Sequence, residues 1–232
     1  MKIVILCGGL GSRLSEETKV KPKPMVKVGG KPILCHITDI YKKFGFNEFI
    51  LALGYKGEYI KNFYLKNKNS EKIKLVNTGK NTMTGGRLLR LKKYFQKGET
   101  FMLTYGDGLS SQNIKKLLSL HNRHKKIATI TAVRPPARFG EIKLRGSKVL
   151  KFQEKPQISA SWINGGFFIF NYKIFDFIKG DKTMLEREPL EKLAKKKQLV
   201  AYKHYGFWRC MDTMRDKILL DKICKGKKIP WK

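Results

Sequence analysis

The chain opens with MKIVILC over residues 1–7, and GGLGSRL follows directly over residues 8–14. The first stretch is short and apolar, which predicts a buried β-strand. The turn Gly8-Gly9-Leu10-Gly11 that follows it lets the backbone approach a ligand closely and adopt positive φ angles. Backbone N–H groups in such a turn can surround a phosphate, and Arg13 adds a cation that binds phosphate with two hydrogen bonds. The opening therefore predicts a polyphosphate site where the first strand ends.

Apolar and amphipathic segments alternate through the first half of the chain. Strands are expected over residues 3–7, 48–53, 73–76, 100–105 and 128–133, and helices over 33–44, 57–65, 87–95 and 114–124. This β-α-β-α order predicts a Rossmann-like α/β fold, with a mixed, mostly parallel sheet flanked by helices. Ligands on such sheets bind at the carboxyl ends of the strands, where the turns at residues 8–13 and 106–108 both lie.

The second half is expected to continue the same domain. Residues 141–144 and 149–153 resemble the strands of a hairpin, 163–169 a further strand, and 186–197 and 214–224 amphipathic helices. No linker rich in Pro, Gly or Ser divides the chain, so one domain over residues 1–232 is predicted, with halves of about 1–135 and 136–232.

The charge of the chain leaves two classes of function open. Lys and Arg number 50 against 18 Asp and Glu, which gives a formal net charge of +32. Such a charge attracts polyanions, so a nucleic-acid-binding protein is one alternative. The lysines are spread over the whole chain, however, and no recognition-helix, RRM or zinc-finger signature is present. An enzyme with a lysine-rich surface, with no specific nucleic-acid partner, is the favoured interpretation.

Cysteine spacing and hydropathy indicate a compartment. The four cysteines are scattered without a C-x-x-C pair, which argues against a zinc site or a disulfide framework. No signal peptide precedes the first strand, and the apolar stretches are too short to span a bilayer. A cytoplasmic protein is expected.

The glycine-rich turn matches neither of two common phosphate-binding motifs. A Walker A loop would need a lysine after its last glycine, and a dinucleotide fingerprint would need glycine where Leu14 stands. Lys21-Pro22-Lys23-Pro24-Met25 supplies a second cationic segment, in which the prolines stiffen the backbone around Lys23. Together the two segments suggest a site for a nucleoside triphosphate.

Taken in order, the motifs resemble those of the sugar-1-phosphate nucleotidyltransferase family. They are GGLGSRL (8–14), KPKPM (21–25), GKP (30–32), MTGGR (83–87), YGDG (105–108), FQEKP (152–156), INGGFF (163–168), GFW (206–208) and MDT (211–213). The resemblance covers nearly the whole chain and implies the nucleotide-diphospho-sugar transferase fold. It also implies attack of a sugar 1-phosphate oxygen on the α-phosphorus of a nucleoside triphosphate. The substrates it implies are CTP and glucose 1-phosphate, while a thymidylyl- or uridylyltransferase acting on a hexose 1-phosphate remains an alternative.

The resemblance also implies roles for individual residues. Arg13, Lys23 and Asp107 are expected to be catalytic, and Asp107 and Asp212 to bind Mg²⁺. Expected to bind the nucleotide are Leu6, Cys7, Gly8, Gly9, Leu10, Gly11, Ser12, Arg13, Lys23, Thr82, Thr84, Gly85, Arg87 and Gly106. Expected to bind the sugar phosphate, in the second half, are Glu154, Lys155, Asn164 and Gly165.

Two further expectations concern base selection and assembly. Arginine can only donate hydrogen bonds, so Arg87 at the base edge would match the adjacent acceptors of cytosine and oppose the N–H of uracil. The family further implies a homo-oligomer. The short region between residues 65 and 76 leaves its subunit number open.

Overall fold

The first strand, β1 (Lys2–Cys7), lies inside a seven-stranded sheet of order β12-β8-β11-β6-β1-β4-β5. The computed structural model describes residues 1–67, 72–135, 140–154 and 161–232. The other six strands are β4 (Glu48–Leu53), β5 (Lys72–Asn77), β6 (Thr100–Tyr105), β8 (Ala128–Val133), β11 (Ile163–Asn171) and β12 (Leu199–His204). Only β11 runs antiparallel to its neighbours, β6 and β8. The mixed, mostly parallel sheet confirms the predicted fold class.

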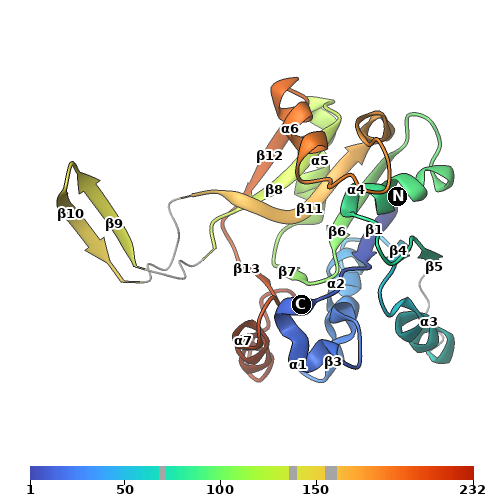
Figure 1. Cartoon of the computed structure of the whole chain (residues 1–232), viewed down its shortest axis with the longest axis horizontal. Helices are drawn as coiled ribbons and strands as arrows, with labels where there is room; N and C mark the ends of the chain where they lie inside the picture. The colour runs from blue at the N-terminus through green and yellow to red at the C-terminus, as the bar shows by residue number, and fades with distance from the viewer. Residues whose placement is uncertain (68–71, 136–139, 155–160) are drawn as a thin grey trace.

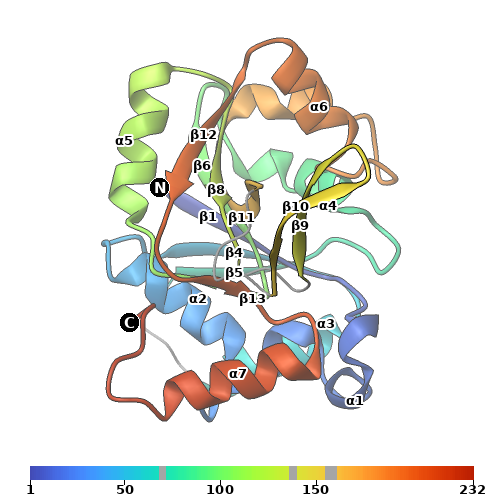
Figure 2. The same ribbon diagram turned by 90° about the vertical axis from the view of Figure 1, so that its left-hand side faces the viewer.

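The side chains of β1 show why both faces of the sheet are covered. Ile3 and Ile5 belong to one buried cluster, and Val4 and Leu6 belong to the other. A strand with apolar side chains on both faces needs helices on both sides. One face packs against α2 (Ile33–Lys42), α3 (Gly57–Lys66), α5 (Ile114–His124) and α7 (Met214–Cys224). The other packs against α4 (Thr84–Arg90) and α6 (Glu188–Lys195), as the layers in Figure 2 show.

Short elements connect the strands and helices of the fold. They are α1 (Ser15–Thr18), β2 (Lys27–Val28), β3 (Lys31–Pro32), β7 (Gly108–Ser110), β13 (Trp208–Cys210) and the 3₁₀ turns η1 (Ser12–Leu14), η2 (Lys23–Met25), η3 (Lys92–Tyr94) and η4 (Tyr172–Phe177). Strand β13 pairs antiparallel with β7, and this pairing brings the segment before α7 back beside the end of β6.

A hairpin of β9 (Glu141–Arg145) and β10 (Lys148–Gln153) extends away from the body of the molecule (Figure 1). None of the helices among the described residues is long and apolar enough to cross a membrane.

Several predicted boundaries differ from the structure. The helix expected over 87–95 begins earlier, at Thr84, and ends at Arg90, before a separate 3₁₀ turn. The helix expected from residue 186 starts at Glu188, with Pro189 in its first turn, where a missing N–H costs nothing. The sequence analysis did not predict β12, the edge strand that continues the sheet beside β8.

Candidate active site

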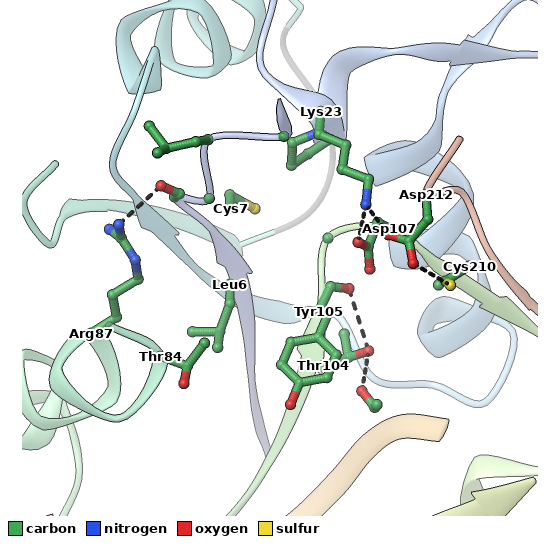
Figure 3. A pocket seen from close by; sticks show the side chains of 18 of the residues that line it. Leu6, Cys7, Lys23, Thr84, Arg87, Thr104, Tyr105, Asp107, Cys210 and Asp212 are labelled. Carbon is green, nitrogen blue, oxygen red and sulfur yellow. Dashed lines mark hydrogen bonds and ion pairs between the residues drawn. The ribbon is translucent and has the colours of Figure 1, made fainter. Parts of the chain in front are cut away.

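One ammonium group joins two carboxylates from distant parts of the chain. Lys23 Nζ lies 2.6 Å from Asp107 Oδ2 and 2.6 Å from Asp212 Oδ1 (Figure 3). Lys23 stands on η2, between Pro22 and Pro24, and Asp107 lies in the turn between β6 and β7. The backbone N–H of Met211 donates to the carbonyl of Asp107 at 2.9 Å, which holds Asp212 beside Asp107. The sequence analysis expected Lys23 to be catalytic and the two aspartates to bind Mg²⁺, and the structure brings the three side chains together.

The charges of this cluster support one another. Burial lowers the pKa of Lys23, but the carboxylates of Asp107 and Asp212 outweigh it and raise the pKa above its usual range. Burial raises the pKa of Asp212, and the hydrogen bond from Lys23 reverses this, so the pKa lies below its usual range. Both groups are therefore charged near neutral pH. Arg13, which is mostly exposed, adds a second cation 3.1 Å from Asp212 Oδ2.

Cys210 lies against the same carboxylate. Its Sγ is 3.3 Å from Asp212 Oδ2, to which the thiol donates. Burial raises the pKa of Cys210 to about 12, and the charges of Asp107 and Asp212 act in the same direction. The thiol therefore stays protonated and serves as a hydrogen-bond donor.

The glycine-rich loop forms the wall next to this cluster. Gly11 has a φ of 67°, a left-handed conformation that favours glycine. The hydroxyl of Thr18 donates to the carbonyls of Gly11 and Leu14 at 3.1 and 2.9 Å, which ties the loop to α1. The loop is thus held in shape by its own chain.

Arg87 lies at the opposite end of the site, buried on α4. Its two Nη atoms donate to the carbonyls of Gly8, Leu53, Gly79 and Lys80 and to the hydroxyl of Thr78. In Figure 3 its guanidinium points toward the glycine-rich loop. A Cβ added at Gly8 would lie 2.2 Å from Arg87 Nη1, so a larger residue there would displace the guanidinium. The structure thus gives Arg87 the task of joining two loops, whereas the sequence analysis expected its guanidinium to reach the base edge.

A cavity of about 690 Å³ connects these groups. Most of the predicted site residues line it: Leu6, Cys7, Gly8, Gly9, Leu10, Gly11, Ser12, Arg13, Lys23, Thr82, Thr84, Arg87, Gly106, Asp107, Asn164, Gly165 and Asp212.

Two predicted residues in the described part of the chain do not line the cavity. Gly85 is buried behind it, where its N–H donates to the carbonyl of Thr183 at 3.0 Å. Glu154 follows β10 and lies on the extended hairpin, with Gly140 beside it. The expectation that Glu154 belongs to the sugar site of its own chain is therefore not met here. Lys155 lies outside the described residues.

Other residues line the cavity although no role was assigned to them. Tyr105 and Trp208 stood in the quoted motifs, and Trp208 donates from its indole to the carbonyl of Gly165 at 2.7 Å. Lys80, Asn81 and Cys210 lie outside those motifs, and no local sequence signal marks them.

The two carboxylates suit a divalent cation that also has phosphate ligands. They converge on one point, since a single nitrogen lies 2.6 Å from both. Within the described residues, no group of three or more His, Cys, Asp or Glu is placed to hold a metal by itself. Mg²⁺ is commonly bound by one or two carboxylates together with phosphate oxygens and water. The donor set therefore fits Mg²⁺ in the presence of a nucleotide.

Comparison with known proteins identifies related sequences and structures. The family model described as "Nucleotidyl transferase" matches residues 2–213. The glucose-1-phosphate cytidylyltransferase of Salmonella typhimurium is 46% identical over 254 aligned positions, which cover 100% of this chain and 99% of that protein. A probable glucose-1-phosphate cytidylyltransferase of Bacillus subtilis is 42% identical, with the same coverage. Both alignments are longer than this 232-residue chain, so the chain lacks residues that these relatives have.

Solved structures share the fold. HddC from Yersinia pseudotuberculosis, complexed with GMP-PN, superposes with a TM-score of 0.75 at 26% identity. The match covers 95% of this chain and 98% of that one.

Proposed function

Because the chain belongs to the nucleotidyl transferase family, we propose that it transfers the cytidylyl group of CTP to glucose 1-phosphate, giving CDP-glucose and pyrophosphate. The full-length similarity to glucose-1-phosphate cytidylyltransferases supports this choice of substrates. Membership in the family favours an enzyme over the nucleic-acid-binding alternative. The observation that carries the proposal is the cluster of Lys23, Asp107 and Asp212 on the same cavity as the glycine-rich loop.

The reaction needs two anions to meet. An oxygen of the sugar phosphate forms a bond to the α-phosphorus of CTP, and the bond from that phosphorus to the bridging oxygen breaks as pyrophosphate leaves. No covalent enzyme intermediate is required. Catalysis then depends on positioning and on neutralising charge.

The residues of the cavity divide this work. The loop of residues 8–12 binds the triphosphate through its backbone, and Arg13 neutralises the departing pyrophosphate. Lys23 exchanges its carboxylate partners for oxygens of the α-phosphate and of the incoming phosphate. Asn164 and Gly165 line the same cavity, and in this proposal they bind the sugar.

Mg²⁺ is the cofactor of this proposal. Asp107 and Asp212 would hold it together with phosphate oxygens, and when bound it would supply Lewis-acid polarisation of the reacting phosphoryl group. The carboxylates are already held side by side by the backbone contact between Met211 and Asp107, so little rearrangement is needed to receive a cation.

A substrate panel tests the proposed function. Purified protein is incubated with each of CTP, UTP, dTTP, GTP and ATP against several hexose 1-phosphates, and pyrophosphate release is followed with Mg²⁺ or with EDTA. The expected result is Mg²⁺-dependent release with CTP and glucose 1-phosphate above every other pair. Preferred use of dTTP or UTP would replace the substrate assignment, and no turnover with any pair would overturn the enzyme assignment. The single domain, the cytoplasmic location and the homo-oligomer stay predictions.

A further inference from the structure

Glu186 connects two walls of the cavity. It precedes α6 in the second half of the chain, and each of its carboxylate oxygens accepts a hydrogen bond from a different element. The hydroxyl of Tyr105, at the end of β6, donates to Oε1 at 2.5 Å. The hydroxyl of Thr84, at the start of α4, donates to Oε2 at 2.6 Å. Tyr105 and Thr84 both line the cavity, on either side of Leu6 in Figure 3.

A carboxylate is an acceptor only, and this fixes the direction of the hydrogen bonds around it. The hydroxyl proton of Thr84 must point to Glu186, so the Thr84 oxygen is left to accept, and it does so from the backbone N–H of Leu185 at 2.9 Å. The hydroxyl proton of Tyr105 must likewise point to Glu186.

Tyr105 lies beside the glycine pair of the INGGFF motif. A Cβ added at Gly166 would lie 2.6 Å from Cδ2 of Tyr105, so the ring packs directly against this backbone. The side chain of Asn164 accepts from the N–H of Gly166 at 2.7 Å, and Asn164 lines the cavity with Tyr105. Glu186 therefore connects Thr84, which was predicted for the nucleotide, to Tyr105, which lies beside the segment predicted for the sugar phosphate.

We propose that Glu186 is a positioning residue that fixes the orientation and hydrogen-bond polarity of Thr84 on the nucleotide side and of Tyr105 on the sugar side. The inference rests on the proposed transfer from CTP to glucose 1-phosphate. Glu186 would not contact the reacting atoms, and its loss would weaken binding of the two substrates rather than the chemical step.

Replacing Glu186 with glutamine changes the hydrogen-bond polarity of the side chain and keeps its shape. The glutamine side chain has the same size as glutamate but offers one acceptor and one donor group. Whichever hydroxyl faces the amide nitrogen has to accept instead of donate. For Thr84 this adds a second donor beside the N–H of Leu185, and for Tyr105 it removes the acceptor of the hydroxyl proton. Glu186→Gln therefore disturbs at least one side of the site.

The experiment measures KM for each substrate separately, together with kcat and Tm. Glu186→Gln should raise the KM for CTP, for glucose 1-phosphate or for both by about three- to tenfold, with kcat within about threefold of wild type. Tyr105→Phe should raise only the KM for glucose 1-phosphate. In the variant that combines the two changes, that KM should not exceed the larger single effect, because both act through the hydrogen bond between Tyr105 and Glu186. Glu188→Gln is the matched control, since Glu188 lies at the surface, where it forms ion pairs with Lys179 and Lys192.

Each outcome decides something. If Glu186→Gln leaves both KM values within twofold, or if its effect multiplies with that of Tyr105→Phe, the proposal is overturned. Wild-type protein that makes no CDP-glucose overturns the proposed function instead. The melting temperatures then still test the connection, because losses of Tm that simply add in the double variant would show that Glu186 and Tyr105 are not coupled.

Discussion

Lys23 is a cation held between the two carboxylates that we propose bind Mg²⁺. This residue also gives the most direct test of the site, because Lys23→Met keeps the aliphatic side chain and removes the charge. Pyrophosphate release should fall about 10²- to 10³-fold, the usual cost of losing one preorganised charge partner of the transition state. Lys27→Met, on the exposed neighbouring strand, should keep wild-type activity. Undiminished turnover by Lys23→Met would remove Lys23 from the mechanism.

The same substitution makes the metal site measurable without turnover. When the ammonium is gone, Asp107 and Asp212 repel each other in a mostly buried place, so Tm in EDTA should drop by about 3–8 °C. Mg²⁺ can take the place of the lost cation and should restore most of this difference. Adding Asp212→Asn to Lys23→Met should remove both the drop and the Mg²⁺ effect. A Tm that does not respond to Mg²⁺ in Lys23→Met would argue against a cation between the carboxylates.

The guanidinium of Arg87 joins two loops through hydrogen bonds to their backbone carbonyls. Arg87→Lys keeps the charge but cannot reach the carbonyls of Gly8, Gly79 and Lys80 together, so buried acceptors lose their donors. We expect the free energy of unfolding in urea to fall by about 2–4 kcal/mol. Affinity for CTP should fall as well, since the glycine-rich loop loses its anchor. Arg90→Lys, at an exposed ion pair with Asp181, should leave the free energy of unfolding nearly unchanged.

The kinetics of this variant also test base selection. If Arg87 reads cytosine once the nucleotide is bound, the ratio of kcat/KM for CTP over UTP should fall in Arg87→Lys. An unchanged ratio with weaker CTP binding would leave Arg87 only the structural task that its hydrogen bonds describe.

At the scale of elements, hydropathy patterns predicted the central strands well and the edge poorly. Residues 48–53, 100–105 and 128–133 are apolar runs, and they form β4, β6 and β8 with those bounds. Strand β12 is half-buried and ends in Lys203 and His204, so its sequence lacks a long apolar run. Its place beside β8 depends on tertiary pairing, which no local pattern contains.

Some residues of the site could likewise be predicted from the sequence, and others could not. Lys23, Asp107 and Asp212 stood in motifs, and the resemblance to the family assigned them roles in one site. Glu186 is separated from Tyr105 by 81 positions and from Thr84 by 102, and nothing in its own neighbourhood marks it. The partners of Arg87 are carbonyl groups, which every residue has, so its structural task could not be predicted from residue types.

Buried histidines on three elements make stability depend on pH. His36 on α2 needs a neutral ring, because Nε2 donates to the carbonyl of Val28 while Nδ1 accepts from the indole of Trp231. Burial lowers the pKa of His36, and it does the same for His121 on α5 and His204 on β12. Each pKa is lower in the folded than in the unfolded chain. The stability they contribute is therefore complete above the unfolded value of about 6.5 and is lost as pH falls below it.

We expect the free energy of unfolding in urea to fall between pH 7.5 and pH 5.5, by about 1.4 kcal/mol for each unit of pKa shift at full protonation. His36→Gln should show a smaller fall than wild type. His124→Gln, with an exposed side chain at the end of α5, should follow the wild-type profile. A free energy of unfolding that does not change over this pH range would show that folding does not lower the pKa of these histidines.

At the scale of the whole molecule, the hairpin of β9 and β10 has an exposed apolar face. Ile142 pairs with Phe152 and Leu144 with Val149 across the two strands, so all four side chains lie on one face. Each is more than half exposed. An isolated two-stranded hairpin is marginally stable in water, and an apolar patch of this kind usually contacts a partner.

We therefore expect the subunits of the predicted homo-oligomer to contact one another through this apolar face of the hairpin. Ile142→Lys with Val149→Lys puts charges on the apolar face, and this variant should have a lower mass by light scattering than wild type. Lys143→Gln with Lys151→Gln alters the opposite face and should keep the wild-type mass, because those side chains alternate with the apolar ones. Wild-type protein with the mass of one chain, 26.8 kDa, at micromolar concentration would show that the face stays uncovered. If the mass is a multiple of this value and falls only in the first variant, the apolar face is what joins the subunits.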